Sequence, residues 1–497
     1  MFKKTTLFLM IATGLMVCQI IATGHVFLSN RAVLEQTSLL TQAGYLSVPN
    51  EIVARDLTGL APAMAGGLFF TLSLGAGLTV LSFLAAWTWI FLFHRSRSAL
   101  ITIAILHLLL LLAVNFKGAN LFPSLYIMIV PLTVFVITIR CARPPFQTRS
   151  VRFYIFAHAA PLLFLSILWG TQMNDRIFIN VRDTLLLSNA FGLKLNAFYY
   201  DHTLHAAETF RPIHQKLIKT YKMEPFADQT LEKEVRDQLI RLDYLPVRTE
   251  KRVDLEISLD DHGSLLFSRH AMPVLAFPAS RFVADADQTL SRISSAWDKN
   301  KGFRLITILS LVIGLPLTLY AILYLLIHGG LRLLVDEKKA MIIVSLTSVA
   351  IGVMLLVPVF LLETGGPESD KAGAYLASDS PVKRLQALRK INDGKLEITA
   401  FQGYREILAG GSIPERYWAV RALGRSRDEA AYGQLIRFLD SENINIACMA
   451  YHALGMMKEK RAISEIIPRI NVSGKWYVQW YAYHALRRLK WSQRGFP

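Results

Sequence analysis

The segment DHTLHAAETF carries the residue types of a metal site. If it forms one helix, Asp201, His205 and Glu208 are spaced i, i+4 and i+7 and share one face. Carboxylate and imidazole groups placed in this way could bind a divalent metal ion. The same spacing also describes a solvated helix face without a ligand, and both interpretations stay open.

Two histidines lie inside strongly apolar stretches. His107 is near the middle of Ala99–Val114, and His158 lies early in Phe153–Gly170. If both stretches cross a membrane in the same direction, the two imidazoles reach similar depths. Ionisable groups at such depths often ligate a b-type haem, contact a quinone or relay protons. Alternatively, each imidazole donates a hydrogen bond to a carbonyl group of a neighbouring helix.

No other pattern in the chain suggests chemistry. No P-loop, GxGxxG, GxSxG, HExxH or EF-hand pattern occurs where it could work. The cysteines Cys18, Cys141 and Cys448 lie far apart, which predicts neither a disulfide framework nor a thiolate metal site. We therefore expect a protein that is not an enzyme and has no cofactor.

The composition indicates a membrane protein. Of 497 residues, 53% are hydrophobic and only 18% are charged, which is typical of several membrane spans. The basic start MFKK leads into a long apolar stretch without a clear cleavage site, so we expect a retained anchor. The seven predicted spans are Thr5–Phe27, Ala65–Phe93, Ala99–Val114, Leu121–Ile139, Phe153–Gly170, Phe303–Ile327 and Ala340–Leu362.

Basic residues in the short loops predict the orientation. They gather in HRSR, RCARPPFQTRSVR and LRLLVDEKK, whereas the opposite turn, NFKGAN, has one lysine. The positive-inside rule then places the N-terminus in the cytoplasm. Seven spans place the C-terminus and the segment between spans five and six outside, which is the periplasm if the membrane is a bacterial inner membrane.

Prolines and glycines within the spans leave a transport function open, because they could form broken helices around a substrate path. They are also common in membrane helices that only pack together. These residues are Pro131, Pro161, Pro316, Gly66, Gly67, Gly75 and Gly77.

The segment between spans five and six reads as an α+β domain. Helical periodicity appears in residues 182–198, 231–242 and 285–297. Alternating apolar residues on both sides of Asp260–Gly263 predict a β-hairpin. The expected organisation is spans at 1–170, the α+β domain at 171–302, spans at 303–363, a linker at 364–373 and a C-terminal domain at 374–497.

The C-terminal domain contains a repeat. RLQALRKI, WAVRALGRS, MAYHALGMM and YAYHALRRL align on Ala-Leu pairs that begin at Ala387, Ala422, Ala453 and Ala485. The number of residues between successive pairs is typical of a helical hairpin, and neighbouring hairpins would stack to bury one apolar side. The segment from Trp418 resembles the short bacterial HEAT-like repeats, including those of the PBS-lyase type, with their A-x-x-A-L-G pattern. The resemblance implies an α-solenoid that binds other proteins.

The motif YHAL occurs twice in the chain, and the repeat explains both occurrences. His452 and His484 share the register of Arg421 and Gln386. A position that accepts Arg, Gln or His is polar, so we expect a solvated position and no metal ligand. Gly424 and Gly455 match the glycine of the pattern, whereas Arg487 replaces it in the last copy, as is typical of a terminal repeat.

The last copy is rich in aromatic and basic residues. From Lys371 onward the chain has 21 Lys and Arg residues against 11 Asp and Glu residues. Such a surface could contact a protein or anionic lipid headgroups, or its rings could close the solenoid core. Nucleic acid is not expected outside the cell. The candidate protein-binding residues are Trp476, Trp480, Tyr483, Arg487 and Trp491.

The sequence therefore predicts a mainly α, multi-pass membrane protein with an external α+β domain and a C-terminal α-solenoid of HEAT-like repeats. The preferred function is a non-catalytic subunit or scaffold of an inner-membrane complex, whose periplasmic solenoid binds a protein partner. One alternative is a transporter or permease component with external gating domains. Another is a redox membrane subunit with a haem or quinone at His107 and His158.

Overall fold

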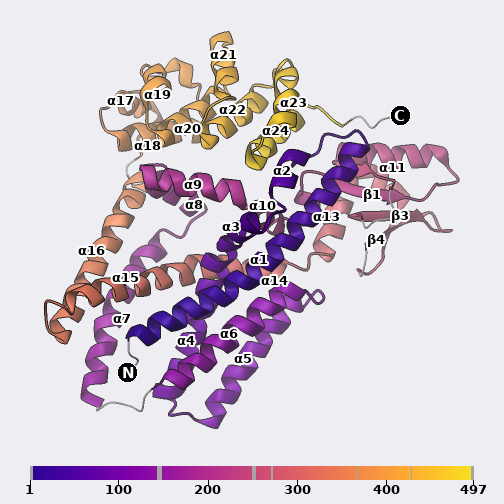
Figure 1. Ribbon diagram of the computed structural model, residues 1–497. Helices are drawn as coiled ribbons and strands as arrows, with labels where there is room; N and C mark the ends of the chain where they lie inside the picture. Colours follow the sequence, from indigo (N-terminus) through magenta and orange to yellow (C-terminus); the bar gives the residue numbers. More distant parts are fainter. Residues whose placement is uncertain are drawn as a thin grey trace. The chain divides into compact units, whose positions relative to one another are not determined.

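The computed structural model describes residues 4–142, 148–248, 253–269, 272–364, 366–426 and 428–493 (Figure 1). The chain forms two compact units. The first, here called the membrane unit, comprises Met1–Val26, Ala63–Leu185 and Lys299–Thr364. The second, here called the composite unit, comprises Phe27–Pro62, Leu186–Asp298 and Gly365–Pro497. Each unit is thus assembled from segments that lie far apart in the sequence.

The membrane unit is entirely helical in its described residues. Helix α1 (Lys4–Gln42) begins in this unit and continues without a break into the composite unit. The other helices of the unit are α3 (Leu60–Phe70), α4 (Ala76–Trp87), α5 (Arg97–Asn115), α6 (Leu121–Cys141), α7 (Thr148–Thr171), α8 (Ile177–Val181), α14 (Lys301–Leu309), α15 (Leu315–Leu331) and α16 (Glu337–Glu363).

Six helical stretches within the described residues are long and apolar enough to cross a membrane. They are Leu7–Gln42, Leu60–Leu92, Arg97–Asn115, Leu121–Cys141, Lys301–Leu331 and Glu337–Glu363. They confirm six of the seven predicted spans. The fifth prediction coincides with α7, of which only Ala159–Thr171 counts as a shorter apolar helix among the described residues. Residues 143–147 of the basic loop RCARPPFQTRSVR lie outside the described residues.

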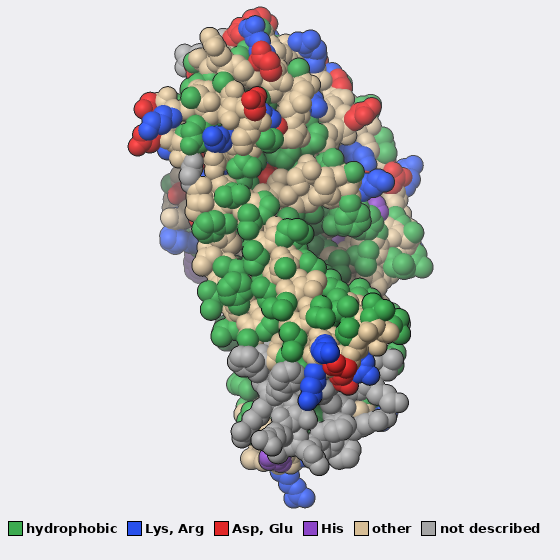
Figure 2. Space-filling view, turned by 90° about the vertical axis from the view of Figure 1, so that its left-hand side faces the viewer, with side chains coloured by type: hydrophobic (Ala, Val, Ile, Leu, Met, Phe, Trp, Pro, Cys, Tyr) green, Lys and Arg blue, Asp and Glu red, His purple; other side chains and the backbone are tan. Residues whose placement is uncertain are grey.

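The outward surface of these helices is apolar, as expected for contact with lipid. On the face that Figure 2 presents, hydrophobic side chains cover a broad area and charged side chains gather elsewhere. Exposed residues of this kind include Leu319, Leu326, Leu346 and Met354. An apolar surface of this extent would be unfavourable in water, so these helices are suited to a bilayer.

Close helix packing accounts for several of the membrane glycines. A Cβ atom on Gly77 would lie 2.3 Å from the Ser310 hydroxyl, and one on Gly314 would lie 2.2 Å from the Gly77 Cα atom. A Cβ atom on Gly75 would lie 2.7 Å from the Cys18 sulfur. Small residues at crossings allow helix backbones to approach closely in membranes. Short π-helical turns, at Thr71–Gly75, Thr88–Leu92 and Ser310–Gly314, interrupt the α-helices of this unit.

The composite unit contains a five-stranded mixed sheet in the order β2-β1-β3-β4-β5. Strand β1 pairs in parallel with β2 and β3, and the remaining pairs are antiparallel. Phe267, Phe282 and Leu239 belong to the core between the sheet and its helices. The strands are β1 (Lys219–Met223), β2 (Tyr244–Pro246), β3 (Leu255–Leu259), β4 (Ser264–Ser268) and β5 (Leu275–Pro278). The helices and helical turns between Ala190 and Ala296 are α9 (Ala190–His202), α10 (Leu204–Thr209), η4 (Ile213–Gln215), α11 (Gln229–Arg241), α12 (Ala279–Ala284) and α13 (Ala286–Ala296).

The predicted hairpin is confirmed in detail. Strands β3 and β4 pair antiparallel around Asp260–Gly263, and Gly263 has a φ of 75°, which favours glycine. The Asp260 carboxylate accepts hydrogen bonds from the backbone N–H groups of His262 and Ser264. The predicted helices at 231–242 and 285–297 correspond to α11 and α13. The helix predicted at 182–198 is interrupted, because α9 begins only at Ala190.

The C-terminal region of the composite unit is a stack of short helices. Helices α18, α20, α22 and α24 carry the four predicted Ala-Leu pairs, while α21 and α23 follow α20 and α22 as the second helices of the middle hairpins. The bounds are α17 (Ala372–Leu376), α18 (Pro381–Asp393), α19 (Tyr404–Gly410), α20 (Ile413–Leu423), α21 (Glu429–Phe438), α22 (Ile444–Met457), α23 (Ala462–Val472) and α24 (Trp476–Arg488).

Candidate protein-binding site

The Ala-Leu pairs form the seam between successive first helices of the stack. Ala387, Ala422, Ala453 and Ala485 are all buried, as are the leucines that follow them. A Cβ atom on Gly424 would lie 2.7 Å from the Ala453 Cα atom, and one on Gly455 would lie 3.0 Å from the Ala485 Cα atom. Each glycine therefore allows the next first helix to approach closely.

A family model of HEAT repeats matches residues 403–487. In a HEAT repeat array each helical hairpin packs against the next one, but no further hairpin follows α24 within the described residues. The two outer copies lack the glycine, with Arg389 in the first and Arg487 in the last. The Arg487 side chain contacts Asp243. Neither the curated proteins nor the solved structures contain a match to the chain. The predicted copy on α18 precedes the matched residues.

We call the stack from α18 to α24 the HEAT array. The aromatic face of its last helix, α24, packs against other segments of the same chain. Trp476 is only 4% exposed and packs with Val53, Leu57 and Leu204. Tyr483 is fully buried, in a cluster with residues such as Leu245. Trp480 and Trp491 are partly buried against the same clusters. Four of the five predicted protein-binding side chains therefore contribute to the core of the composite unit.

The fifth residue, Arg487, belongs to a buried polar contact with the α+β region. The Tyr483 hydroxyl donates a hydrogen bond of 2.7 Å to Asp243, and the Arg487 Nε atom lies 3.1 Å from the other carboxylate oxygen. Burial raises the pKa of Asp243, while the arginine and the tyrosine oppose that shift. A buried carboxylate needs such partners, so this contact specifies how α24 packs.

Asn50 fastens the turn between α23 and α24. Its side-chain N–H groups point to the carbonyl oxygens of Ile470, Asn471 and Ser473, at 3.0, 3.0 and 3.1 Å. Its backbone N–H donates to the Gln479 side chain over 2.9 Å. The Asn50 side-chain oxygen also caps α2 (Glu51–Asp56). One residue from the segment that follows α1 thus satisfies carbonyl groups at the end of the HEAT array.

Further contacts join α24 to α9 and α10. The rings of Tyr200 and Tyr477 stack with centroids 4.0 Å apart. The Arg211 guanidinium lies over the Trp480 ring at 4.6 Å. Together with the Asn50 and Asp243 contacts, they join the HEAT array and the α+β region into a single structure. The sequence alone placed them in two external domains.

The predicted metal site is not assembled. Thr203 separates α9 from α10, so Asp201 and His205 do not lie on one continuous helix. Asp201 forms an ion pair of 2.7 Å with Lys475. The described residues contain no group of three His, Cys, Asp or Glu side chains that could hold a metal ion. The assumption of one continuous helix, on which the prediction rested, is therefore wrong.

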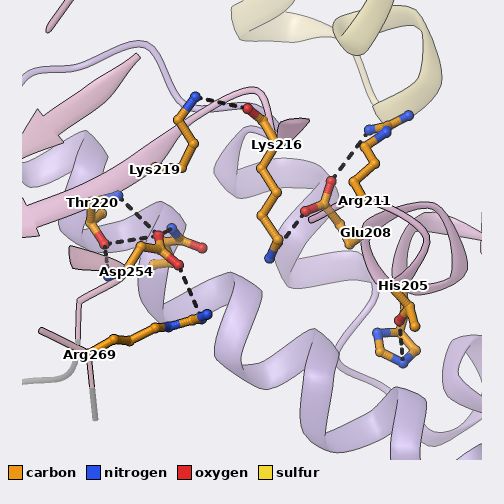
Figure 3. Close-up of polar contacts among 10 residues, drawn as sticks. His205, Glu208, Arg211, Lys216, Lys219, Thr220, Asp254 and Arg269 are labelled. Atoms are coloured by element: carbon orange, nitrogen blue, oxygen red, sulfur yellow. Dashed lines mark hydrogen bonds and ion pairs between the residues drawn. The ribbon is translucent and has the colours of Figure 1, made fainter. Parts of the chain in front are cut away.

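The remaining two metal candidates have separate surroundings (Figure 3). His205 is buried, with its Nε2 atom 3.4 Å from the Thr209 hydroxyl. Glu208 lies between two cations, at 3.6 Å from Arg211 and 3.5 Å from Lys216. Glu208 thus already has cationic partners.

A second polar cluster lies at the start of β1. Asp254 accepts hydrogen bonds from the Thr220 backbone and hydroxyl groups, and from Gln36 of α1. Arg269 lies 3.6 Å from the other Asp254 oxygen (Figure 3). Burial lowers the pKa of the neighbouring Lys219 to about 8, although nearby carboxylates oppose this shift. The Thr220 and Arg269 contacts of Asp254 join neighbouring strands of the sheet, and the Gln36 contact joins the sheet to α1.

The intramembrane histidines remain without a demonstrated role. His107 is half-buried on α5, and the side chain of His158 lies outside the described side chains. A haem or quinone site at these residues stays a prediction. Sequence reasoning did not single out His25, whose ring stacks on Phe122 with centroids 4.3 Å apart and lies 3.5 Å from the Tyr126 hydroxyl. The apolar pattern around His25 gave no signal of these aromatic neighbours.

The repeated histidines are less solvated than their register suggested. His452 and His484 are both half-buried, and Gln386 in the same register is buried. Burial and nearby arginines lower the pKa of His452 to about 3 and that of His484 to about 4. Both imidazoles are therefore neutral at pH 7.

Proposed function

We propose that this protein is a non-catalytic subunit or scaffold of a membrane complex that uses its HEAT array to bind a protein partner. The observation that carries the proposal is the HEAT match on a chain whose described residues include six long apolar helices. HEAT arrays present an extended surface to other proteins. Apolar helices would keep that surface close to a bilayer.

The contacts within the HEAT array indicate which surface is available to a partner. Helix α24 is covered by the α+β region and by Phe27–Pro62, as its buried tryptophan and tyrosine indicate. The opposite end of the array has no comparable cover among the described residues. Val382 of α18, for example, is 37% exposed although it is apolar. The partner therefore contacts the uncovered surface of the array, which runs from α18 to the exposed Arg488 of α24.

The connectivity supports seven crossings and one location for the composite unit. Its three segments contact one another, for example through Gln36 with Asp254 and Asn50 with Gln479, so they share one side of the membrane. Between α1 and α9 the chain must then cross an even number of times. The stretches Leu60–Leu92, α5 and α6 give three crossings, so α7 provides the fourth.

The remaining crossings agree with this arrangement. Between α13 and α17 the chain passes through α14–α15 and α16, which are two crossings. The basic turns His94–Arg97 and Arg332–Lys339 fall on the side opposite the composite unit. The positive-inside rule then favours a cytoplasmic N-terminus and an external composite unit, which is periplasmic in a bacterial inner membrane.

The test is photo-crosslinking in intact cells, using the full-length chain with a benzophenone amino acid at Val382. Deletion of the HEAT array would be uninformative, because α24 completes the core around Trp476 and Tyr483. We expect one protein to be crosslinked at this exposed position. A benzophenone at Leu319, which is 55% exposed on α15, serves as the lipid-facing control. Absence of any protein adduct at Val382 and at other exposed positions of α18–α22 would contradict the proposal.

A further inference from the structure

A group of basic side chains surrounds His452 on the first helices of the HEAT array. Arg421, Arg425 and Arg488 all lie close enough to lower the pKa of His452 through their positive charge. The Arg488 guanidinium lies 3.0 Å from the His452 Nδ1 atom. We call Arg421, Arg425, His452 and Arg488 the basic cluster.

The arginines of the basic cluster form no ion pair with a carboxylate among the described residues. Arg421 lies over the Trp418 ring at 5.1 Å, and its Nε atom is buried without a hydrogen-bond partner. Arg425 donates to the backbone carbonyl groups of Ile391 and Asn392. Arg488 contacts a neutral histidine. A buried guanidinium N–H group without an acceptor is costly.

The arginines on the second helices differ from those of the basic cluster. Arg461 contacts Glu429 at 2.5 Å, and Arg469 pairs with Asp440 at 3.0 Å and with Glu465 at 2.9 Å. These pairs lie on α21 and α23 or beside them. Acidic partners therefore serve Arg461 and Arg469, as they also serve Arg384 and Arg487 on first helices, whereas the arginines of the basic cluster form no such ion pair within the described residues.

The repeat itself creates this arrangement. Arg421 lies on α20 and Arg425 lies in the turn that follows this helix, while His484 and Arg488 are one turn apart on α24. His452 occupies the same register on α22, between them. Stacking of the three helices therefore brings side chains from three repeats together. Such a row could follow an extended segment rather than one small ion.

We propose that the basic cluster binds an acidic segment of the partner protein, rich in Asp and Glu. The inference rests on the proposed function, because it assigns the chemistry of the segment that the HEAT array binds. Charge complementarity supports this occupant, and planar guanidinium groups bind carboxylates through paired hydrogen bonds. Complementary charges also steer encounter and exclude wrong partners.

The binding test uses full-length protein in detergent and fluorescently labelled hexaglutamate as the probe. Fluorescence anisotropy should show hexaglutamate binding that weakens as salt increases, and no binding of hexaglutamine. The variant Arg421→Gln with Arg488→Gln should bind hexaglutamate at least about tenfold more weakly. Arg437→Gln on α21, where the side chain is exposed, is the matched control and should leave the affinity unchanged.

Two further results separate the possible failures. Equal hexaglutamate affinity in the double variant and the control would overturn the proposal. Binding of phosphatidylglycerol vesicles that is lost in the double variant, with no hexaglutamate binding, would assign the basic cluster to lipid instead. If the Val382 crosslink persists in the double variant, the HEAT array still binds a protein and only the basic-cluster inference fails. Protection of Cys448, which is 1% exposed, checks that the double variant is folded.

Discussion

Replacement of Asn50 gives the sharpest test of how the HEAT array is fastened. Its side chain has two functions, since the oxygen caps α2 and the N–H groups point to the three carbonyl oxygens of Ile470, Asn471 and Ser473. Asn50→Ala removes both. A lost cap costs about 1 kcal/mol, and two lost hydrogen bonds to buried carbonyl groups cost about 1 kcal/mol each. We therefore expect the free energy needed to open α22 and α24 locally to fall by about 3 kcal/mol.

Asn50→Asp separates the two functions. Asp is as good an N-cap as Asn, so a residue that only capped α2 would tolerate this change. In the structure, however, Asp would place a carboxylate oxygen where the amide N–H groups now face three carbonyl oxygens. We expect Asn50→Asp to cost at least about 2 kcal/mol, since it loses both hydrogen bonds and adds repulsion.

Alkylation of Cys448 in the native protein measures this loss. Its sulfur is buried between α22 and α24, 3.8 Å from the Tyr477 carbonyl oxygen, and reacts only when these helices open. A loss of about 3 kcal/mol should raise the alkylation rate by about 100-fold. Cys18 is buried in the membrane unit and provides an internal control whose rate should not change. Alkylation of Cys448 in Asn50→Asp at the wild-type rate would refute the reasoning.

Three other predictions concern the same composite unit. Gly424→Ala should destabilise the HEAT array by about 1–3 kcal/mol, because the new Cβ atom would meet the α22 backbone. Gly433→Ala has no atom within 4 Å of the new Cβ atom and should stabilise the array by about 0.5–1 kcal/mol. Thermal unfolding of the two variants compares these effects. Tyr483→Phe should cost about 1–2 kcal/mol, because a buried carboxylate loses a donor, and the Cys448 alkylation rate should rise accordingly. Since the pKa values of His452 and His484 are lowered in the folded state, the unfolded state binds more protons below pH 6.5. The free energy of unfolding should therefore fall on acidification from about pH 6.5 to 4.5, by at most about 1.4 kcal/mol per pH unit for each histidine. Replacing both His452 and His484 with Gln should reduce this pH dependence, as measured by thermal unfolding.

Local patterns in the sequence predicted the elements that depend on local interactions. The hairpin at Asp260–Gly263, the helices α11 and α13, and the register of the HEAT array all follow from side-chain periodicity and turn chemistry. Periodicity succeeds here because each of these features is decided by residues that are close in sequence.

The contacts that decide the candidate site could not be predicted in the same way. Trp476 and Tyr483 have the composition of a binding surface, and only their distant partners show that they are buried. Asp243 lies 240 residues from Tyr483 in the sequence. The break at Thr203 likewise depends on how α9 and α10 pack, and it separated the metal candidates. Tertiary contacts of this kind leave no trace in a single sequence.

The order in which the chain is synthesised adds a constraint to its folding. Asn50 donates to Gln479 across 429 residues, and Gln493 donates to the Leu46 carbonyl group across 447 residues. The segment Phe27–Pro62 therefore emerges from the ribosome long before the residues that cover it. Such distant contacts form late and leave apolar surface exposed meanwhile. The composite unit can close only after its last residues are made, so a truncated chain would lack this closure and be open to degradation.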